Sequence, residues 1–243
     1  MRFGPLIFVL LLTTLDCFPA GVDLVSGRGI RNPVVETEIN RGIIKFVEGD
    51  LSAARHHYDE ALRLDPKAWQ AYYDRAVLSI KERKFDLAMR DLNESIRLRS
   101  AYLRAAVLRA EVNEHLGKYE EALAELDHLQ KICVSTKTGE DVYNGRAWIR
   151  ATSRNPAFRN GRLAVDDAIR ACNLSKWQSP FSLDTLAAAY AETGDFDSAV
   201  RYERKAIETV SNVGKTPAYI AAFRKLFEQR LASFEQHKRP SYE

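Results

Sequence analysis

The chain has 243 residues and a formal net charge of +3, with 46% hydrophobic and 28% charged residues. Basic and acidic residues are interspersed along it instead of forming one basic run. This distribution excludes an extended nucleic-acid-binding patch and predicts a solvated surface. Beyond the first 20 residues no second long apolar stretch occurs, so we expect the mature chain to be soluble, without stable insertion in a membrane.

The N-terminus has the pattern of a secretory signal peptide. Arg2 is followed by 11 apolar or uncharged residues from Pro5 to Leu15, and then by small residues at Ala20 and Gly21. The run is shorter than the roughly 20 residues that span a membrane. We therefore expect a signal peptide over residues 1–20, cleavage near Ala20 or Gly21, and an exported, periplasmic or secreted protein. A buried first helix is the alternative, and residues 21–34 are expected to be extended.

A period of 34 residues organises residues 35–132. It relates four sets of positions: Gly42, Ala76 and Ala110; Gly49, Arg83 and Gly117; Ala54, Ala88 and Ala122; and Tyr58, Leu92 and Leu126. Small residues at fixed positions let two helices cross closely, because a larger side chain would overpack the contact. A period of this length predicts three stacked helix-turn-helix repeats.

The second half continues less regularly. Residues 133–142 are predicted to be a loop, and residues 143–214 two further repeats, the first of which carries an inserted turn at 154–161. Whether this turn binds a partner or is decoration stays open. Residues 215–243 are predicted to form a capping helix and a tail, because apolar residues recur there at helical spacing.

These units resemble the tetratricopeptide repeat. That family has small residues at three slots and a proline near its thirty-second, and this chain has Gly42, Ala54, Ala61 and Pro66 there. The stretch 147–207 resembles a variant frequent in exported or multidomain bacterial proteins. The resemblance implies an all-α fold, a right-handed α-solenoid, and a role in binding proteins or peptides.

The resemblance also implies a partner-binding groove lined by the first helix of each repeat. Its residues here are apolar: Ile39, Ile43, Phe46, Tyr73, Val77 and Ile80. Family members that grip the carboxylate tails of heat-shock chaperones have Lys and Asn at these slots, which argues against that activity. An apolar groove fits an amphipathic helix or an apolar peptide. The alternative is that these side chains are core or are covered by residues 22–35 or by the capping helix.

No catalytic, cofactor or metal site is predicted. His56 and His57 are adjacent on a helix and point about 100° apart, so they cannot share a metal as an i, i+4 pair does. Asp195 follows a turn glycine and is expected to favour the start of a helix. The tripeptide at 214–216 resembles the end of a nucleotide-binding loop, but the upstream glycine of that motif is missing.

The sequence therefore predicts a non-enzymatic scaffold that binds a protein or peptide partner. The alternatives are a structural or self-associating subunit of an envelope complex and, third, an accessory to an envelope enzyme. Cys133 and Cys172 could pair in an oxidising compartment. Neighbouring helices lie about 8–10 Å apart, however, and a disulfide needs Cα atoms within about 7 Å.

Overall fold

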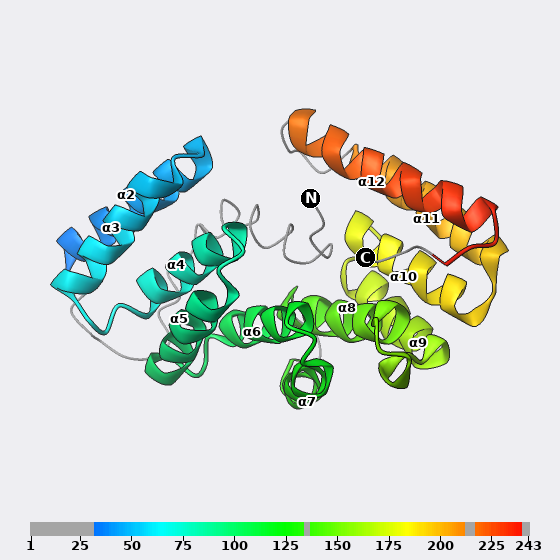
Figure 1. The fold of residues 1–243 in the computed structure, drawn as a ribbon, viewed down its shortest axis with the longest axis horizontal. Helices are drawn as coiled ribbons and strands as arrows, with labels where there is room; N and C mark the ends of the chain where they lie inside the picture. Colours follow the sequence, from blue (N-terminus) through cyan, green and yellow to red (C-terminus); the bar gives the residue numbers. More distant parts are fainter. Residues whose placement is uncertain (1–31, 134–136, 212–216, 240–243) are drawn as a thin grey trace. The chain divides into compact units, whose positions relative to one another are not determined.

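The computed structural model describes residues 32–133, 137–211 and 217–239, which hold eleven α-helices, one short 3-10 turn and no strand (Figure 1). This all-α architecture of helical hairpins confirms the predicted fold class. The predicted signal peptide at 1–20, most of the segment 21–34, and the tripeptide at 214–216 lie outside the described residues.

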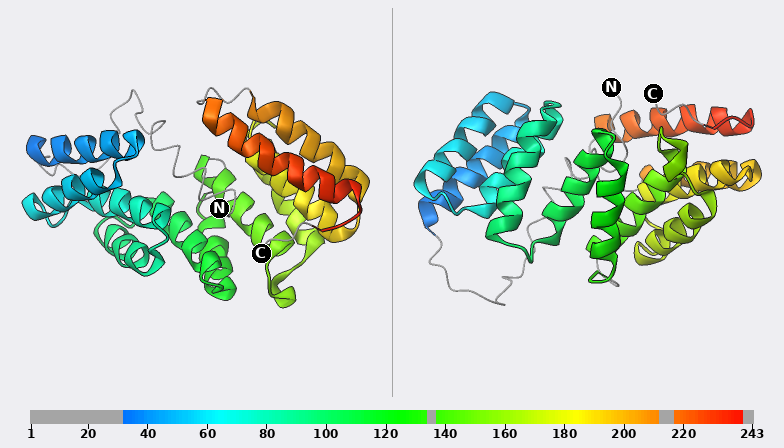
Figure 2. Two further views of the ribbon diagram at one scale, coloured as in Figure 1. Left: turned by 45° about the horizontal axis from the view of Figure 1, so that its top comes forward. Right: turned by 60° about the horizontal axis from the view of Figure 1, so that its bottom comes forward.

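The chain divides into two compact units between Val112 and Asn113, inside α6. The helices up to this point are α2 (Pro33–Glu48), α3 (Leu51–Leu64), α4 (Trp69–Lys81), α5 (Phe85–Leu98) and α6 (Leu103–His115). The second unit contains α7 (Tyr119–Gln130), α8 (Lys137–Thr152), η2 (Pro156–Phe158), α9 (Gly161–Leu174), α10 (Pro180–Thr193), α11 (Phe196–Val210) and α12 (Pro217–Glu235). Consecutive helices pair as antiparallel hairpins within each unit (Figures 1 and 2).

Several helices begin at a side chain that caps their free backbone amides. Asn32 accepts a hydrogen bond from the Val34 amide at 3.0 Å, and Pro33 occupies the first helical position, where a missing N–H costs nothing. Asp195 accepts from the Ser198 amide at 3.0 Å, which confirms its predicted place at a helix start. That hydrogen bond lowers the pKa of the Asp195 carboxyl.

The turns of the repeats use the left-handed backbone region. Gly49 and Gly117 have φ of 87° and 74°, as expected of glycines that end a helix. Arg83 occupies the same slot of the second repeat and also has a positive φ, of 61°. A left-handed conformation costs a residue with a Cβ about 1–2 kcal/mol, so the repeat imposes the turn geometry even where the glycine is missing.

The small slot of the first repeat serves a close helix crossing. A Cβ built on Gly42 of α2 would lie 2.4 Å from Cε1 of Tyr58 on α3, closer than real contacts allow. Tyr58 is only 2% exposed, so its ring has little room to move away. This geometry is the physical reason for the small residue that the sequence pattern indicated.

The predicted loop at 133–142 was wrong over its second half, because α8 already begins at Lys137. Gly139, which suggested a turn, is a point of close contact inside this helix: a Cβ there would lie 2.4 Å from the Cys133 carbonyl oxygen. The side chain of Lys137 donates to Glu140 at 2.6 Å across the first turn. At the other end of the chain, α2 begins two residues before the predicted boundary at Val35, since Asn32 and Pro33 form a helix start.

The inserted turn at 154–161 packs against its own unit. The ring of Phe158 lies 5.5 Å from that of Tyr119 at the start of α7, and Arg159 approaches Glu192 at the end of α10, with nitrogen and oxygen 3.7 Å apart. The Asn160 amide donates to the Arg150 carbonyl at 2.8 Å. These contacts give the insertion a structural role in joining α7, α8 and α10.

The predicted capping helix corresponds to α12. Its buried side chains are Phe223, Phe227, Arg230 and Phe234, which recur at helical spacing. Phe234 packs in a cluster with alanines of α10 and α11, and Phe223 and Phe227 make edge-on contacts with Phe181. The helix therefore covers the apolar face of the last repeat and leaves a polar face outward.

Candidate functional site

The six residues predicted to line a groove all belong to the first unit, and five of them are buried. Ile39 and Phe46 are buried on α2, Tyr73, Val77 and Ile80 are buried on α4, and Ile43 is half-buried. The ring of Tyr73 meets that of Tyr102 edge-on at 5.1 Å, and the ammonium of Lys81 lies 4.6 Å from the ring centre of Phe46. Their burial favours the alternative reading, in which these side chains are core.

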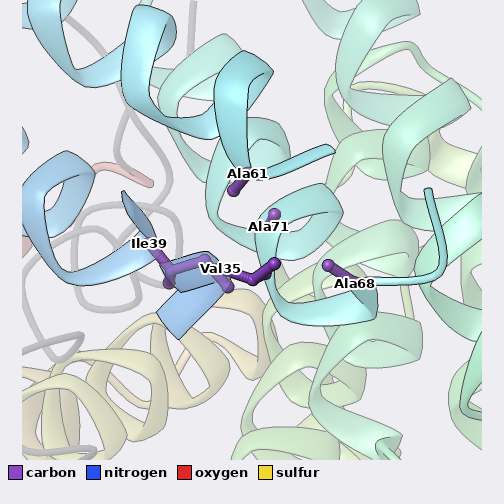
Figure 3. Packing of buried hydrophobic residues seen from close by; sticks show 5 residues of the cluster. All are labelled: Val35, Ile39, Ala61, Ala68 and Ala71. Atoms are coloured by element: carbon purple, nitrogen blue, oxygen red, sulfur yellow. The ribbon is translucent and has the colours of Figure 1, made fainter. Parts of the chain in front are cut away.

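The interface between the first and second repeats is built from small residues. Ala68 and Ala71 at the start of α4 pack with Ala61 of α3 and with Val35 and Ile39 of α2 (Figure 3). Ala71 and Ala61 are fully buried. One side of α4 is thus covered by the preceding repeat, and this side is the stacking face of the helix.

Arginines bridge successive repeats through one regularly spaced slot of the second helix. Arg75 of α4 donates to Asp59 of α3 at 2.7 Å, and Arg109 of α6 donates to Asn93 of α5 at 2.7 Å. In the second unit the Nε of Arg146 lies 2.9 Å from a carboxylate oxygen of Asp127. Residues 59, 93 and 127 are each 34 apart, so the same slot of the second helix accepts a bridge in three consecutive repeats.

Arg75 also binds the next helix. It makes a two-pronged interaction with Asp91 of α5, at 2.9 and 2.7 Å, and this bond is the main reason that the pKa of its guanidinium is raised. Asp91 is buried, so the pair is better shielded from solvent than an ordinary surface ion pair. One arginine therefore fastens α4 to the helices on both sides.

The equivalent face of α2 is open to solvent. Thirty-four residues before Ala68, Arg75 and Leu78 stand Val34, Arg41 and Ile44. Ala68 is 6% exposed and Leu78 is fully buried, whereas Val34 and Ile44 are 55% and 54% exposed. The side chain of Arg41 is 58% exposed and pairs with Glu38 of its own helix. Among the described residues, the first repeat thus presents an uncovered stacking face, defined by Val34, Thr37, Arg41, Ile44 and Glu48.

Sequence reasoning did not single out this face, although the signal for it was present. The 34-residue period assigns Val34 and Ile44 to slots that are buried in the second repeat, and Arg41 to the slot of the bridging Arg75. Only the burial of those later residues shows that the slots face a preceding helix. The open face of α2 is therefore the candidate binding surface.

The second unit contains a buried charged cluster. Arg230 of α12 donates to the Asp184 carboxylate of α10, and Glu203 of α11 is fully buried beside them. The guanidinium of Arg230 also lies 5.0 Å from the ring centre of Trp148 on α8. Burial raises the pKa of Glu203 well above its usual value. The cluster joins four helices and is closed to solvent, which indicates a structural role.

The remaining reactive side chains give no support for chemistry. Cys133 and Cys172 are buried free thiols, and burial raises the pKa of Cys172 to about 12. Where side chains are described, no group of three or more His, Cys, Asp or Glu residues is arranged to hold a metal ion. His57 instead contacts Glu38 at 2.7 Å, an interaction that lowers the pKa of this carboxyl.

Within the described ranges, no helix has the length and apolar character needed to cross a membrane. The described residues define an α-helical repeat protein whose hairpins stack through small residues and arginine bridges. Residues 39–101 match the family model of the tetratricopeptide repeat. Repeats of this family are in general protein-interaction modules without enzymatic activity.

Solved structures support the fold. A thermophilic tetratricopeptide-repeat protein from Thermus thermophilus is similar over 83% of this chain and 99% of its own, with 18% identity and a TM-score of 0.64. PilW, a widely conserved type IV pilus biogenesis factor, is similar over 84% of this chain and 92% of its own, with 16% identity and a TM-score of 0.65. At these identities the likeness concerns the fold alone.

Curated relatives match parts of the sequence. A tetratricopeptide repeat and J domain-containing co-chaperone of Cryptococcus neoformans is 28% identical over 133 residues, which are 55% of this chain and 23% of the relative. A human DnaJ homolog of subfamily C is 31% identical over 99 residues, which are 39% of this chain and 19% of the relative. The chain thus spans about a fifth to a quarter of the length of these relatives.

Proposed function

We propose that this chain is a non-enzymatic scaffold that holds a protein partner on the open stacking face of α2. The observation that carries the proposal is the difference in exposure between equivalent slots: Ile44 is 54% exposed, and Leu78 is fully buried. Exposed apolar side chains gathered around a charged residue are typical of interaction sites. The match of residues 39–101 to a repeat that in general binds proteins supports the same role.

The partner that we propose is not a free carboxylate tail. The names of the matched relatives include co-chaperones, but the slots at which carboxylate-gripping family members have Lys and Asn hold Ile39, Ile43, Tyr73 and Val77 here. Three of these four are buried and Ile43 is half-buried. An occupant of the α2 face would instead meet the exposed Val34 and Ile44.

We also propose that the protein is exported and acts outside the cytoplasm. The support is the pattern of residues 1–20, with Arg2, an apolar run and a small residue at Ala20. Fractionation of cells that produce the full chain with a C-terminal tag tests this proposal. A shortened chain outside the cytoplasm is expected, and a full-length cytoplasmic chain would contradict it.

The test of the scaffold function is crosslinking of the tagged full-length chain in its own cell. We expect one dominant crosslinked partner, and we expect Ile44→Glu to abolish its capture because a carboxylate would be desolvated in the interface. Ile132→Glu is the matched control, since Ile132 is also an isoleucine with 54% exposure but lies outside the stacking face. Equal capture by the two variants would refute the proposed surface.

Self-association is the second candidate function, because the same apolar face could pair with another copy. Light scattering of the purified chain separates the two. A monomer that still captures its partner through Ile44 supports the scaffold. A dimer that Ile44→Glu converts to a monomer, with no other crosslinked protein, supports the assembly function.

A further inference from the structure

We propose that the open stacking face of α2 binds, in trans, an amphipathic helix that carries a basic residue and, four residues later, a carboxylate. This inference rests on the proposed scaffold function and specifies the chemistry of the partner. The charges and exposures of α2, compared with those of α4, lead to it.

The internal contact between α3 and α4 shows which charges this kind of face accepts. Arg55 of α3 pairs with Glu82 at the end of α4, and Asp59, one turn further along α3, accepts from Arg75. The two helices run antiparallel. Arg55 followed by Asp59 on α3 therefore lies opposite Glu82 and Arg75, which are seven residues apart at the end of α4 and within it. The charge pattern therefore fixes both the orientation and the register of the helix that docks.

The first described helix, α2, carries the same charge pattern, and no described helix is docked on it. Glu48 and Arg41 lie 34 residues before Glu82 and Arg75 and are likewise seven residues apart. Their side chains are 52% and 58% exposed, and each pairs with a neighbour on α2, Glu48 with Lys45 and Arg41 with Glu38. The Lys45–Glu48 pair is exposed and contributes little to stability. Glu38 is buried but also contacts His57 at 2.7 Å, so it keeps a partner when Arg41 turns to a docked helix.

The apolar part of the face fits a helix as well. Val34, Thr37 and Ile44 occupy the slots of Ala68, Ala71 and Leu78, which are all buried in the second repeat. Val34 is larger than Ala68, and Ile44 matches Leu78 in size and apolar character, so a docked helix would have apolar side chains to cover at both slots. The face thus has the apolar side chains Val34 and Ile44 on either side of Arg41, with Glu48 beyond Ile44.

The same charges disfavour a symmetric pair of α2 helices from two copies of this chain. Arg41 lies midway between Val34 and Glu48, so a symmetric pair of α2 helices centred on this stripe would place Arg41 against Arg41. Like charges across an interface suppress this symmetric arrangement. The outer face of α12 carries exposed Arg224 and, four residues later, exposed Glu228, so a head-to-tail contact with a second copy is an outcome that the test below separates.

A peptide of residues 50–66 of this chain is the probe, because it contains α3 with Arg55, Asp59 and its own cap, Asp50, whose side chain accepts from the Ala53 amide at 2.9 Å. Its binding to the full-length chain is followed by fluorescence anisotropy. We expect saturable binding, and we expect the protein variant Arg41→Glu with Glu48→Arg to weaken it roughly tenfold. The peptide variant Arg55→Glu with Asp59→Arg should restore binding to this protein variant.

The charge swap also separates the proposed site from other outcomes. A peptide that displaced the internal α3 from α4 would not respond to changes on α2, so binding that the protein variant leaves unchanged overturns the inference. Failure of the swapped peptide to restore binding overturns it too. If no peptide binds while Ile44→Glu still abolishes capture of the cellular partner, the scaffold function stands and the proposed partner chemistry is wrong. A dimer broken by Arg41→Glu identifies a second copy as the occupant and also overturns the inference.

Discussion

At the scale of single residues, the helix crossing of the first repeat depends on a matched pair of side chains. The period places Gly42 opposite Tyr58, whereas the same two slots of the second repeat hold Ala76 and Leu92. A Cβ at residue 42 would lie 2.4 to 3.0 Å from three atoms of the Tyr58 ring. A small residue therefore accompanies a large one, and the pair must change together.

This matching predicts the effect of Gly42→Ala. Overpacking costs about 1–3 kcal/mol, which exceeds the helix-propensity gain of about 1 kcal/mol for alanine. We expect a net loss of about 1 kcal/mol in the free energy of unfolding, measured by urea denaturation. The double variant Gly42→Ala with Tyr58→Leu copies the pair of the second repeat and should recover most of the loss. A single variant as stable as the parent would show that Tyr58 can move away.

At the scale of an element, α12 depends on a single buried cation. Arg230 is 7% exposed and neutralises Asp184, which is fully buried on α10. Phe223 and Phe227 supply apolar contacts, but a carboxylate left without its cation in this interior is strongly unfavourable. The docking of the last helix is thus sensitive to one side chain.

Arg230→Met should undock α12. Breaking a buried ion pair by removing one partner costs about 3–5 kcal/mol, and an end helix can open without the rest of the chain. We expect hydrogen exchange over Pro217–Glu235 to become much faster while α8 to α10 stay protected. Lys225→Met removes an exposed cation from the same helix and should have little effect. Addition of Asp184→Asn and Glu203→Gln to Arg230→Met should restore part of the protection, and its failure to do so would contradict the electrostatic cause.

The elements also show how much of the fold could be predicted from the sequence. The repeats, their turns and the capping helix follow from local spacing, because Gly49 or Phe227 signals its role within its own segment. Arg230 could not be recognised, since its partner Asp184 is 46 residues away in sequence and an arginine on a helix normally faces water. The loop predicted at 133–142 failed for a related reason, because Gly139 serves a tertiary contact that only the fold reveals.

The candidate binding surface was only partly accessible from sequence. The predicted groove residues, such as Val77 and Ile80, are apolar at helical spacing, and this pattern does not distinguish a groove from a core. The open face of α2 is found by comparing equivalent slots. Slots that are buried in a later repeat hold exposed residues in the first repeat. That comparison needs the burial of Ala68 and Leu78, and burial depends on the packing of α3 against α4.

At the scale of the whole molecule, buried carboxyl groups set the pH dependence of stability. Burial, with the nearby charge of Asp184, raises the pKa of Glu203 well above its ordinary value of 4.5, and Arg230 opposes this shift only in part. Burial raises the pKa of Asp74 to about 7 from an ordinary 3.8. In both cases the folded chain keeps its proton to a higher pH than the unfolded chain does.

Stability should therefore decrease as the pH rises above the ordinary pKa values of these two carboxyls. Between the unfolded and folded pKa values of Glu203 the folded state binds the extra proton, so the free energy of unfolding falls by about 1.4 kcal/mol per pH unit. The raised pKa of Asp74 also lowers the free energy of unfolding as the pH rises, and this contribution ends near pH 7. The lowered pKa of Glu38 acts only below its ordinary 4.5, and the raised pKa of Cys172 only above its ordinary 9.0, so neither reverses the trend.

Urea denaturation at several pH values, with Glu203→Gln as the comparison, measures how much of the pH dependence of stability comes from the buried cluster. Glutamine keeps a hydrogen-bond donor toward Asp184 at every pH, so the variant should lose the part of the slope that Glu203 contributes. Asp74→Asn should flatten the curve only below pH 7. Parallel curves for the parent chain and Glu203→Gln would mean that Glu203 is ionised in the folded state, with Arg230 shared between two carboxylates.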